Sequence, residues 1–150
     1  MIAVIQRVKR ASVTVEGVVV GSCAAGYAIL LGVAADDTEK DVEVLAVKLS
    51  KLRIFEDENQ KMNRSITDVG GQALVISNFT LLANYSHGNR PEFLAAAPPA
   101  QANRLYEQFC GRLRELIGHV EQGEFGADMT VEIVGDGPVT IVMDSKVLIK

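Results

Sequence analysis

One apolar run constrains the fold of this chain more than any other feature. Residues 26–34 are almost all apolar, and glycine bounds the run. A segment of this length and composition is typical of a strand that is buried on both faces of a sheet, and it is short for a long helix. We therefore expect residues 26–34 to form a central strand.

Further strands are predicted from alternating or β-branched patterns. An alternation of apolar and polar residues precedes Gly17 and three valines follow it, which is typical of a hairpin. Residues 135–138 read Gly-Asp-Gly-Pro and are predicted to be a tight turn between two strands. The predicted strands are residues 1–8, 12–16, 18–20, 72–79, 129–134 and 139–143.

Two long helices complete the predicted domain. Apolar residues recur at helical spacing from Val42 to Leu52, after Asp and Thr residues that can cap a helix. A second helix is expected to begin at Pro99 and to end at Gly118. Residues 82–99 lack periodicity and predict a long loop, a kind of segment that is often functional. The fold class is therefore α/β, a single β-rich mixed domain over residues 1–150 with both helices packed on the sheet.

Composition and charge exclude several classes of protein. The net charge of −4 argues against a protein that coats nucleic acid regardless of sequence. No apolar run reaches the roughly 18 residues of a membrane helix, and no signal-peptide pattern is present, so we expect a cytosolic protein without membrane contact. Cys23 and Cys110 are expected to be buried thiols. His87 and His119 have no neighbours at metal-ligand spacing, so neither a metal nor a cofactor is predicted.

The first candidate for chemistry is residues 77–81, Ser-Asn-Phe-Thr-Leu, where an apolar strand runs into the long loop. Hydroxyl and amide groups at this point can meet a ligand, and backbone N–H groups left unpaired can stabilise an oxyanion. In the alternative interpretation, Ser77 and Thr80 only satisfy backbone groups at the strand end. The residues by themselves favour this alternative.

The second candidate is residues 135–140, Gly-Asp-Gly-Pro-Val-Thr. An X-Pro bond is the one place where a cis peptide has a low cost. A cis bond before Pro138 would turn the carbonyl of Gly137 outward as a rigid acceptor. A plain trans turn is the more frequent structure for such a sequence, since about one X-Pro bond in twenty is cis in folded proteins.

Both candidate segments resemble motifs of the D-aminoacyl-tRNA deacylases. Residues 77–81 are similar to the family's Ser-Gln-Phe-Thr-Leu motif, and residues 135–140 are similar to its Asn-x-Gly-Pro-Val-Thr motif. Asn78 replaces the usual Gln, and Gly135 replaces the usual Asn. Further matches follow in family order along the chain, at residues 5–8, 11–13, 31–33, 53–55, 61–63, 88–91, 97–99 and 125–129.

The resemblance implies a homodimer with strands at the interface and two active sites there. It implies a cis bond at Gly137–Pro138, whose carbonyl reaches into the partner subunit's pocket beside residues 77–81. Arg7 would hold this loop, and Met129 would line the pocket. The resemblance implies catalytic roles for Phe79, Thr80, Gly137 and Pro138, and substrate binding by Arg7, Ser77, Asn78, Leu81, Met129 and Asp136.

The activity that the resemblance implies is hydrolysis of the ester in D-aminoacyl-tRNA and in glycyl-tRNA mischarged on tRNA(Ala). The enzyme would act on the 3′ end of the tRNA. Backbone N–H groups around Phe79 and Thr80 would hold the oxyanion, and the 2′-hydroxyl of the terminal adenosine would help to activate water. A covalent role for Thr80 is less favoured, because no base lies near it in the sequence. A non-catalytic RNA-binding module and a structural assembly protein are the alternatives.

Overall fold

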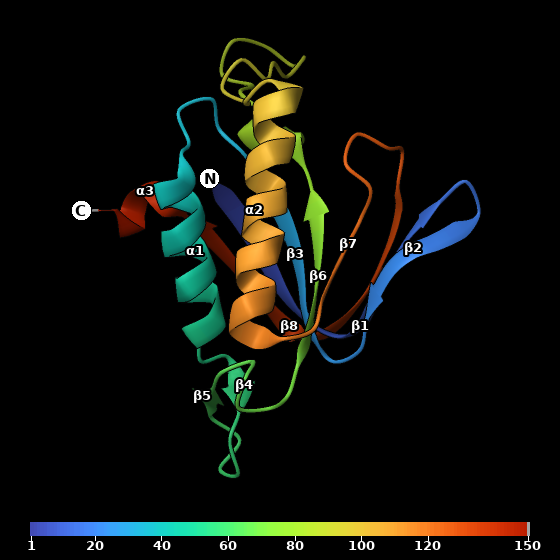
Figure 1. The fold of residues 1–150 in the computed structure, drawn as a ribbon, viewed down its shortest axis with the longest axis vertical. Coiled ribbons are helices and arrows are strands. Elements are labelled where there is room, and N and C mark those ends of the chain that lie inside the picture. The colour runs from blue at the N-terminus through green and yellow to red at the C-terminus, as the bar shows by residue number, and fades with distance from the viewer. Residues whose placement is uncertain (150) are drawn as a thin grey trace.

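The computed structural model describes residues 1–149, which form one sheet-based domain with two long helices (Figure 1). Helices α1 and α2 lie side by side across one face of the main sheet (Figure 1). The helices are α1 (Glu39–Lys51), α2 (Pro99–Ile117) and α3 (Ser145–Leu148), with a 3-10 helix η1 (Phe79–Leu82). The strands are β1 (Ile2–Val15), β2 (Val18–Cys23), β3 (Gly26–Gly32), β4 (Phe55–Glu56), β5 (Met62–Arg64), β6 (Gln72–Ser77), β7 (Val120–Gln122) and β8 (Thr130–Asp144).

The main sheet has the strand order β2-β1-β3-β6-β7, and β8 pairs with β1. The pairs β3–β6 and β6–β7 are parallel, and the other pairs in this sheet are antiparallel. The sheet curves until β2 approaches β7, where the Ser22 N–H donates to the Glu121 carboxylate at 3.1 Å. The result is a β-rich α/β domain, as predicted, and its main sheet is nearly closed.

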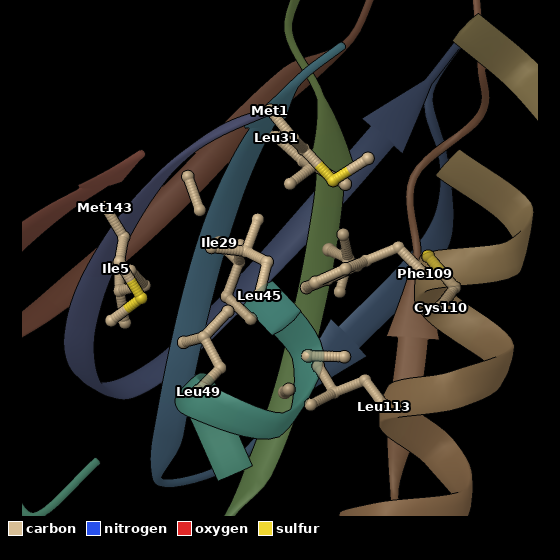
Figure 2. Packing of buried hydrophobic residues seen from close by; sticks show 14 of the residues in the cluster. Met1, Ile5, Ile29, Leu31, Leu45, Leu49, Phe109, Cys110, Leu113 and Met143 are labelled. Carbon is tan, nitrogen blue, oxygen red and sulfur yellow. The ribbon is translucent and has the colours of Figure 1, made fainter. Parts of the chain in front are cut away.

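Strand β3 is central, which confirms the prediction from its apolar run. It pairs with β1 on one side and with β6 on the other, so that Ile29 lies between Ile5 and Val75. All three side chains are fully buried. The helices cover this part of the sheet with a stripe of buried apolar residues, which includes Leu45, Leu49, Phe109 and Leu113 (Figure 2).

Both long helices begin and end where their caps predict. Thr38 and Asp41 form a capping box at the start of α1, and Lys48 and Lys51 lie in its last turn. Pro99 occupies the first position of α2, and Gly118 ends it with a φ of 95°. No helix within the described residues is long and apolar enough to cross a membrane. Cys23 and Cys110 are buried free thiols, as predicted.

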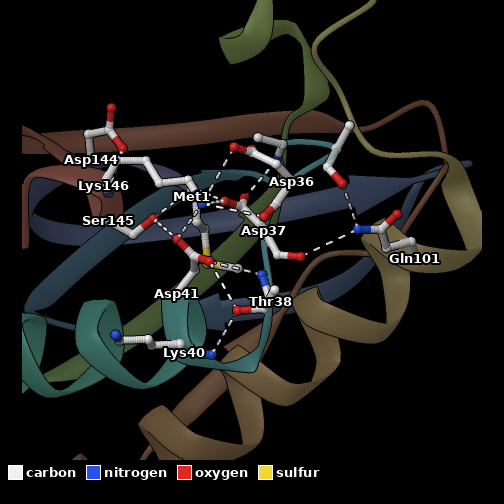
Figure 3. Close-up of polar contacts among 12 residues, drawn as sticks. Met1, Asp36, Asp37, Thr38, Lys40, Asp41, Gln101, Asp144, Ser145 and Lys146 are labelled. Carbon is white, nitrogen blue, oxygen red and sulfur yellow. Dashed lines mark hydrogen bonds and ion pairs between the residues drawn. The ribbon is translucent and has the colours of Figure 1, made fainter. Parts of the chain in front are cut away.

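A buried polar cluster ties the N-terminus to α1 and α3 (Figure 3). The α-amino group of Met1 donates to Asp37 Oδ1 at 2.6 Å and to Ser145 Oγ at 2.8 Å. Ser145 in turn donates to Asp41 at 2.6 Å, and Lys146 Nζ lies 2.9 Å from the same carboxylate. Burial raises the pKa of Asp41, but the bonds from Ser145, from the backbone of Thr38 and from Lys146 outweigh burial and hold the pKa below its usual range.

The prediction of a tight turn at residues 135–138 is wrong, because the chain does not reverse its direction there. Strand β8 continues through this segment and pairs with β1 along almost its whole length, from Thr14 opposite Thr130 to Ile2 opposite Asp144. Gly135 lies opposite Val8, and Thr140 lies opposite Gln6. Residues 136–139 therefore bulge out opposite a single residue of β1, and we call them the β8 bulge. Turn-forming residues here interrupt the ladder without reversing the chain, because β1 is long enough to pair on both sides of the bulge.

Three smaller predictions also differ from the structure. The strand predicted over residues 72–79 ends at Ser77, and Phe79 already belongs to η1. Residues 56–63 are mostly polar, which is typical of a turn, but both ends of this segment also belong to the short β4–β5 hairpin. Strand β7 was not predicted, because three residues are too few to show an alternation and its pairing with β6 comes from the tertiary fold.

Candidate active site

A pocket of about 530 Å³ opens at the carboxyl ends of β3 and β6. Its walls come from η1, from residues 93–97 of the long loop, from the first turns of α2 and from residues 125–129. The polar groups that line it belong to Ser77 and Asn78, while most of the wall is apolar. A concave, largely apolar site with a few polar groups on one side is typical of small-ligand binding.

Aromatic rings make up much of the apolar wall. Phe79 is 57% exposed and meets Phe93 edge-on, with the ring centroids 5.0 Å apart. Tyr106 lies 5.9 Å from Phe125 between ring centroids, and its hydroxyl donates to the carbonyl of Val75 at 2.8 Å. Burial raises the pKa of Tyr106, so this phenol stays protonated at neutral pH. Tyr106 therefore shapes the pocket and does not act there as a base.

The start of η1 supplies the polar side of the site. The N–H of Asn78 donates to the carbonyl of Leu31 at 2.8 Å, which fixes η1 against the end of β3. The Thr80 hydroxyl donates to the side-chain oxygen of Asn78, an amide that cannot serve as a strong base. Within residues 1–149, the N–H groups of Phe79 and Thr80 meet no acceptor, whereas the next N–H, of Leu81, donates to the carbonyl of Asn78. One of these free N–H donors therefore belongs to a residue that lines the pocket, Phe79, and the other belongs to the next residue of η1.

Arg7 holds the β8 bulge in place. Its side chain is buried, and its Nε donates to the main-chain oxygen of Asp136 at 3.1 Å. Nη1 of the same guanidinium donates to the carbonyl of Ile54 at 2.7 Å, and the Asp136 carboxylate lies 3.5 Å from Nε. The Gly137–Pro138 peptide bond is cis, as the resemblance implied, and both residues are exposed.

The structure divides the predicted site residues into two groups. Ser77, Asn78, Phe79 and Met129 line the pocket, and Thr80 and Leu81 follow in η1. The second group, at the β8 bulge, consists of Arg7, Asp136, Gly137 and Pro138.

Within one chain these two groups do not meet. The bulge lies opposite Arg7, which pairs with Tyr27 near the start of β3, whereas Ser77 pairs with Leu31 near the end of β3. Leu31 lies four residue steps beyond Tyr27, a distance of about 13 Å along β3. An isolated subunit therefore presents the bulge to solvent and away from its own pocket.

The sequence did not single out three residues of the pocket wall. Phe93 lies in the long loop that was expected to be functional, and Phe125 lies in one of the segments similar to the family. Tyr106 could have been found only as an aromatic residue on the buried stripe of α2, where it is indistinguishable from ordinary core.

The chain is similar to known proteins in both sequence and structure. A sequence model of the family described as D-Tyr-tRNA(Tyr) deacylase matches residues 4–144. The D-aminoacyl-tRNA deacylase of Anaeromyxobacter dehalogenans is 56% identical over 146 residues, which are 97% of this chain and 98% of the relative. That of Thermus aquaticus is 54% identical over 145 residues, which are 97% of this chain and 95% of the relative. A solved structure described as c-Myc DNA Unwinding Element Binding Protein superposes with a TM-score of 0.91 at 41% identity and covers 96% of this chain and 98% of its own.

The fold, the pocket and these relatives define the class of the protein, which is a deacylase, a hydrolase that acts on ester bonds. The family match spans nearly the whole chain and includes both η1 and the β8 bulge. The chain belongs to the D-Tyr-tRNA(Tyr) deacylase family.

Proposed function

We propose that the protein hydrolyses the ester that joins a D-amino acid to the 3′ end of a tRNA, and releases the free amino acid and the tRNA. One observation carries the proposal: the pocket has aromatic walls, and Phe79 in its lining and the adjacent Thr80 have N–H groups that meet no acceptor within residues 1–149. Its volume of about 530 Å³ suits a terminal adenosine with its aminoacyl ester. Phe79 and Phe93 offer faces and edges against which an adenine ring can pack.

The free N–H groups account for the chemistry without a conventional catalytic triad. Water attacks the ester carbonyl, and the oxygen that gains negative charge accepts hydrogen bonds from Phe79 and Thr80. The leaving group is a ribose hydroxyl, which departs more readily than an amine. The 2′-hydroxyl of the terminal ribose assists the water, since the Thr80 hydroxyl is engaged with Asn78.

A homodimer completes the site in this proposal. The β8 bulge is exposed and held by Arg7, and it lies away from the pocket of its own chain. A second subunit can bring the partner subunit's Gly137 to the pocket, where its carbonyl accepts the α-ammonium group of the substrate. Asp136 and Arg7 then act as positioning residues for this carbonyl, and the dimer has two equivalent sites.

The handedness of the substrate follows from this arrangement. With the ammonium group held by a carbonyl and the ester held by η1, a D-residue directs its side chain out of the pocket. An L-residue directs its side chain into the partner subunit's Gly137 and Pro138 and is rejected by steric clash. Glycine has no side chain to reject, so glycyl-tRNA mischarged on tRNA(Ala) is also a substrate. We place this activity in the cytosol, where aminoacyl-tRNA is made.

The test is to measure deacylation of D-tyrosyl-tRNA, L-tyrosyl-tRNA and glycyl-tRNA(Ala) by the purified full-length protein. We expect rapid hydrolysis of the D- and glycyl esters and a rate for the L-ester that is at least about 100-fold lower, since a severe clash costs several kcal/mol. Comparable rates for the D- and L-esters would overturn the chirality mechanism, and no hydrolysis of any ester would overturn the activity. Sedimentation velocity tests the dimer separately.

A further inference from the structure

The long loop between η1 and Phe93 carries a second feature at the mouth of the pocket. Its two ends, Asn84 and Glu92, pair in antiparallel fashion through two main-chain hydrogen bonds of 2.9 Å each. The loop leaves the pocket wall two residues after η1 ends and returns immediately before Phe93, which lines the pocket. We call residues 84–92 the rim loop; it belongs to the segment above the N-terminal end of α2 in Figure 1.

The base of the rim loop is ordered by its own hydrogen bonds. The side-chain oxygen of Asn84 accepts from the N–H of Ser86 at 3.0 Å and from its hydroxyl at 2.8 Å. The Glu92 carboxylate accepts from the N–H of Leu94 at 2.8 Å. The loop therefore presents its tip from a fixed base, although few side chains of the tip pack on the domain.

The tip exposes an aromatic ring and a cation. Tyr85 is 75% exposed, an unusual position for a tyrosine in a chain whose other two tyrosines are buried. Arg90 is also exposed, and within residues 1–149 its guanidinium meets no carboxylate. An exposed aromatic ring and an unpaired cation on the same loop are the combination that binds single-stranded nucleic acid, since bases stack on the ring and phosphates meet the cation.

The distribution of charge around the pocket favours one path for a negatively charged RNA strand that leaves it. From residue 69 to residue 106 the chain carries one acidic residue, Glu92, although its net charge is −4. On the other side of the pocket, the segment that includes Phe125 carries Glu124 and Asp128, both exposed. A phosphodiester chain that leaves the pocket is repelled by these two carboxylates, whereas on the side of the rim loop it meets the unpaired Arg90 and a single carboxylate, Glu92.

We propose that the rim loop binds the unpaired nucleotides that precede the terminal adenosine of the tRNA. Tyr85 stacks on a base, and Arg90 pairs with a phosphate. This inference rests on the proposed function, because it needs the terminal adenosine in the pocket. Tyr85 and Arg90 are positioning residues for the RNA strand, and they do not touch the ester.

The experiment compares two substrates that share the ester and the terminal adenosine. D-tyrosyl-tRNA has the upstream nucleotides, and 3′-O-D-tyrosyl-adenosine lacks them. For Tyr85→Ala and for Arg90→Ala we expect the KM for D-tyrosyl-tRNA to rise roughly tenfold, the loss of one stacked base or one phosphate contact, with little change in kcat. We expect kcat/KM for 3′-O-D-tyrosyl-adenosine to stay within about twofold of the wild-type value.

Conservative and distant variants provide the controls. Tyr85→Phe and Arg90→Lys keep the ring and the charge, and should recover most of the KM for D-tyrosyl-tRNA. Lys51→Ala removes an exposed cation from the last turn of α1 and should leave the KM for both substrates unchanged. Thermal melting of all variants should match that of the wild type, because both tip side chains are exposed.

The outcomes separate this inference from the proposed function. If both variants raise KM equally for the two substrates, the rim loop does not bind upstream nucleotides. The same conclusion follows if neither variant changes KM for D-tyrosyl-tRNA. If the wild-type protein hydrolyses neither substrate, the proposed function fails, and fluorescence anisotropy with deacylated tRNA still tests the loop. In that measurement, an unchanged Kd for Tyr85→Ala and Arg90→Ala would overturn the inference, and a roughly tenfold weaker Kd supports it.

Discussion

Arg7 and Asp136 are joined by a hydrogen bond of 3.1 Å between the guanidinium Nε and a main-chain oxygen, although 129 residues separate them in the sequence. Because Arg7 is buried and its Nη1 also binds the carbonyl of Ile54, the guanidinium is fixed at both ends. The β8 bulge is thereby attached to β1 and to the segment before β4, and the exposed Gly137 and Pro138 are carried on a rigid support.

Replacing Arg7 should cost both stability and activity. In Arg7→Ala the carbonyls of Ile54 and Asp136 lose their donor, and we expect the free energy of unfolding to fall by about 2–4 kcal/mol. Urea denaturation measures this loss, and deacylation of D-tyrosyl-tRNA should fall at least tenfold under conditions where the variant is folded. Arg10→Ala is the control, because Arg10 and Glu132 are 65% and 62% exposed and their pair should contribute less than about 1 kcal/mol. Equal losses in the two variants would contradict the role of Arg7.

Gly137 should not tolerate a side chain. Its φ of 147° disfavours L-residues, and a Cβ at this position would lie 2.4 Å from the main-chain nitrogen of Val139. We expect Gly137→Ala to displace the bulge and to lower kcat/KM for D-tyrosyl-tRNA at least tenfold. Gly111→Ala is the matched control: nothing lies within 4 Å of its Cβ position in α2, so it should stabilise the protein by about 0.5–1 kcal/mol and leave turnover unchanged. Wild-type turnover in Gly137→Ala would argue against a precise placement of this carbonyl.

The polar cluster at the N-terminus should control stability at acid pH. The pKa of Asp41 is lowered in the folded state, so its contribution is fully present above the ordinary pKa of about 4 for an unfolded Asp and is lost as pH falls toward the folded value. Urea denaturation at pH 7, 4 and 3 should show the free energy of unfolding declining over this range. In Asp41→Asn we expect a loss of about 2–4 kcal/mol at pH 7 and a weaker decline on acidification. A decline that is identical in wild type and variant would show that other carboxylates determine it.

Thr80 should be dispensable as a nucleophile. Its hydroxyl donates to Asn78, whereas the proposed oxyanion contact uses its main-chain N–H, which every substitution except proline retains. We expect Thr80→Ala to keep kcat for D-tyrosyl-tRNA within about tenfold of wild type. A loss of 1,000-fold or more, or an acyl-enzyme intermediate detected by mass spectrometry after rapid quenching, would instead indicate covalent catalysis.

The predictable parts of the fold depend on local patterns. The run at residues 26–34 predicted central strand β3, and helical spacing with caps at Thr38, Pro99 and Gly118 predicted α1 and α2. These signals succeed because hydrophobic periodicity and capping chemistry act over a few residues. The prediction failed at residues 135–138, where the same Gly and Pro residues suit a reversal or a bulge, and only pairing with β1 distinguishes the two.

The candidate site divides in the same way. The motifs at residues 77–81 and 135–140 were evident in the sequence, and residues 77–79 line the pocket. The sequence could not predict that Phe93, Tyr106 and Phe125 would complete the wall, because these residues come from three segments that meet only in the folded chain.

By itself, the sequence determined the central strand β3, the two long helices and the segments that carry the family's motifs, since each depends on residues close in the chain. Only the tertiary structure decided where the β8 bulge lies relative to the pocket. The bulge is opposite Arg7, which holds it, and the Tyr27 partner of Arg7 is about 13 Å along β3 from Leu31 in the pocket wall. The physical reason is that strand register is set by side-chain burial and hydrogen bonding between residues far apart in sequence, and local sequence patterns do not contain those pairings.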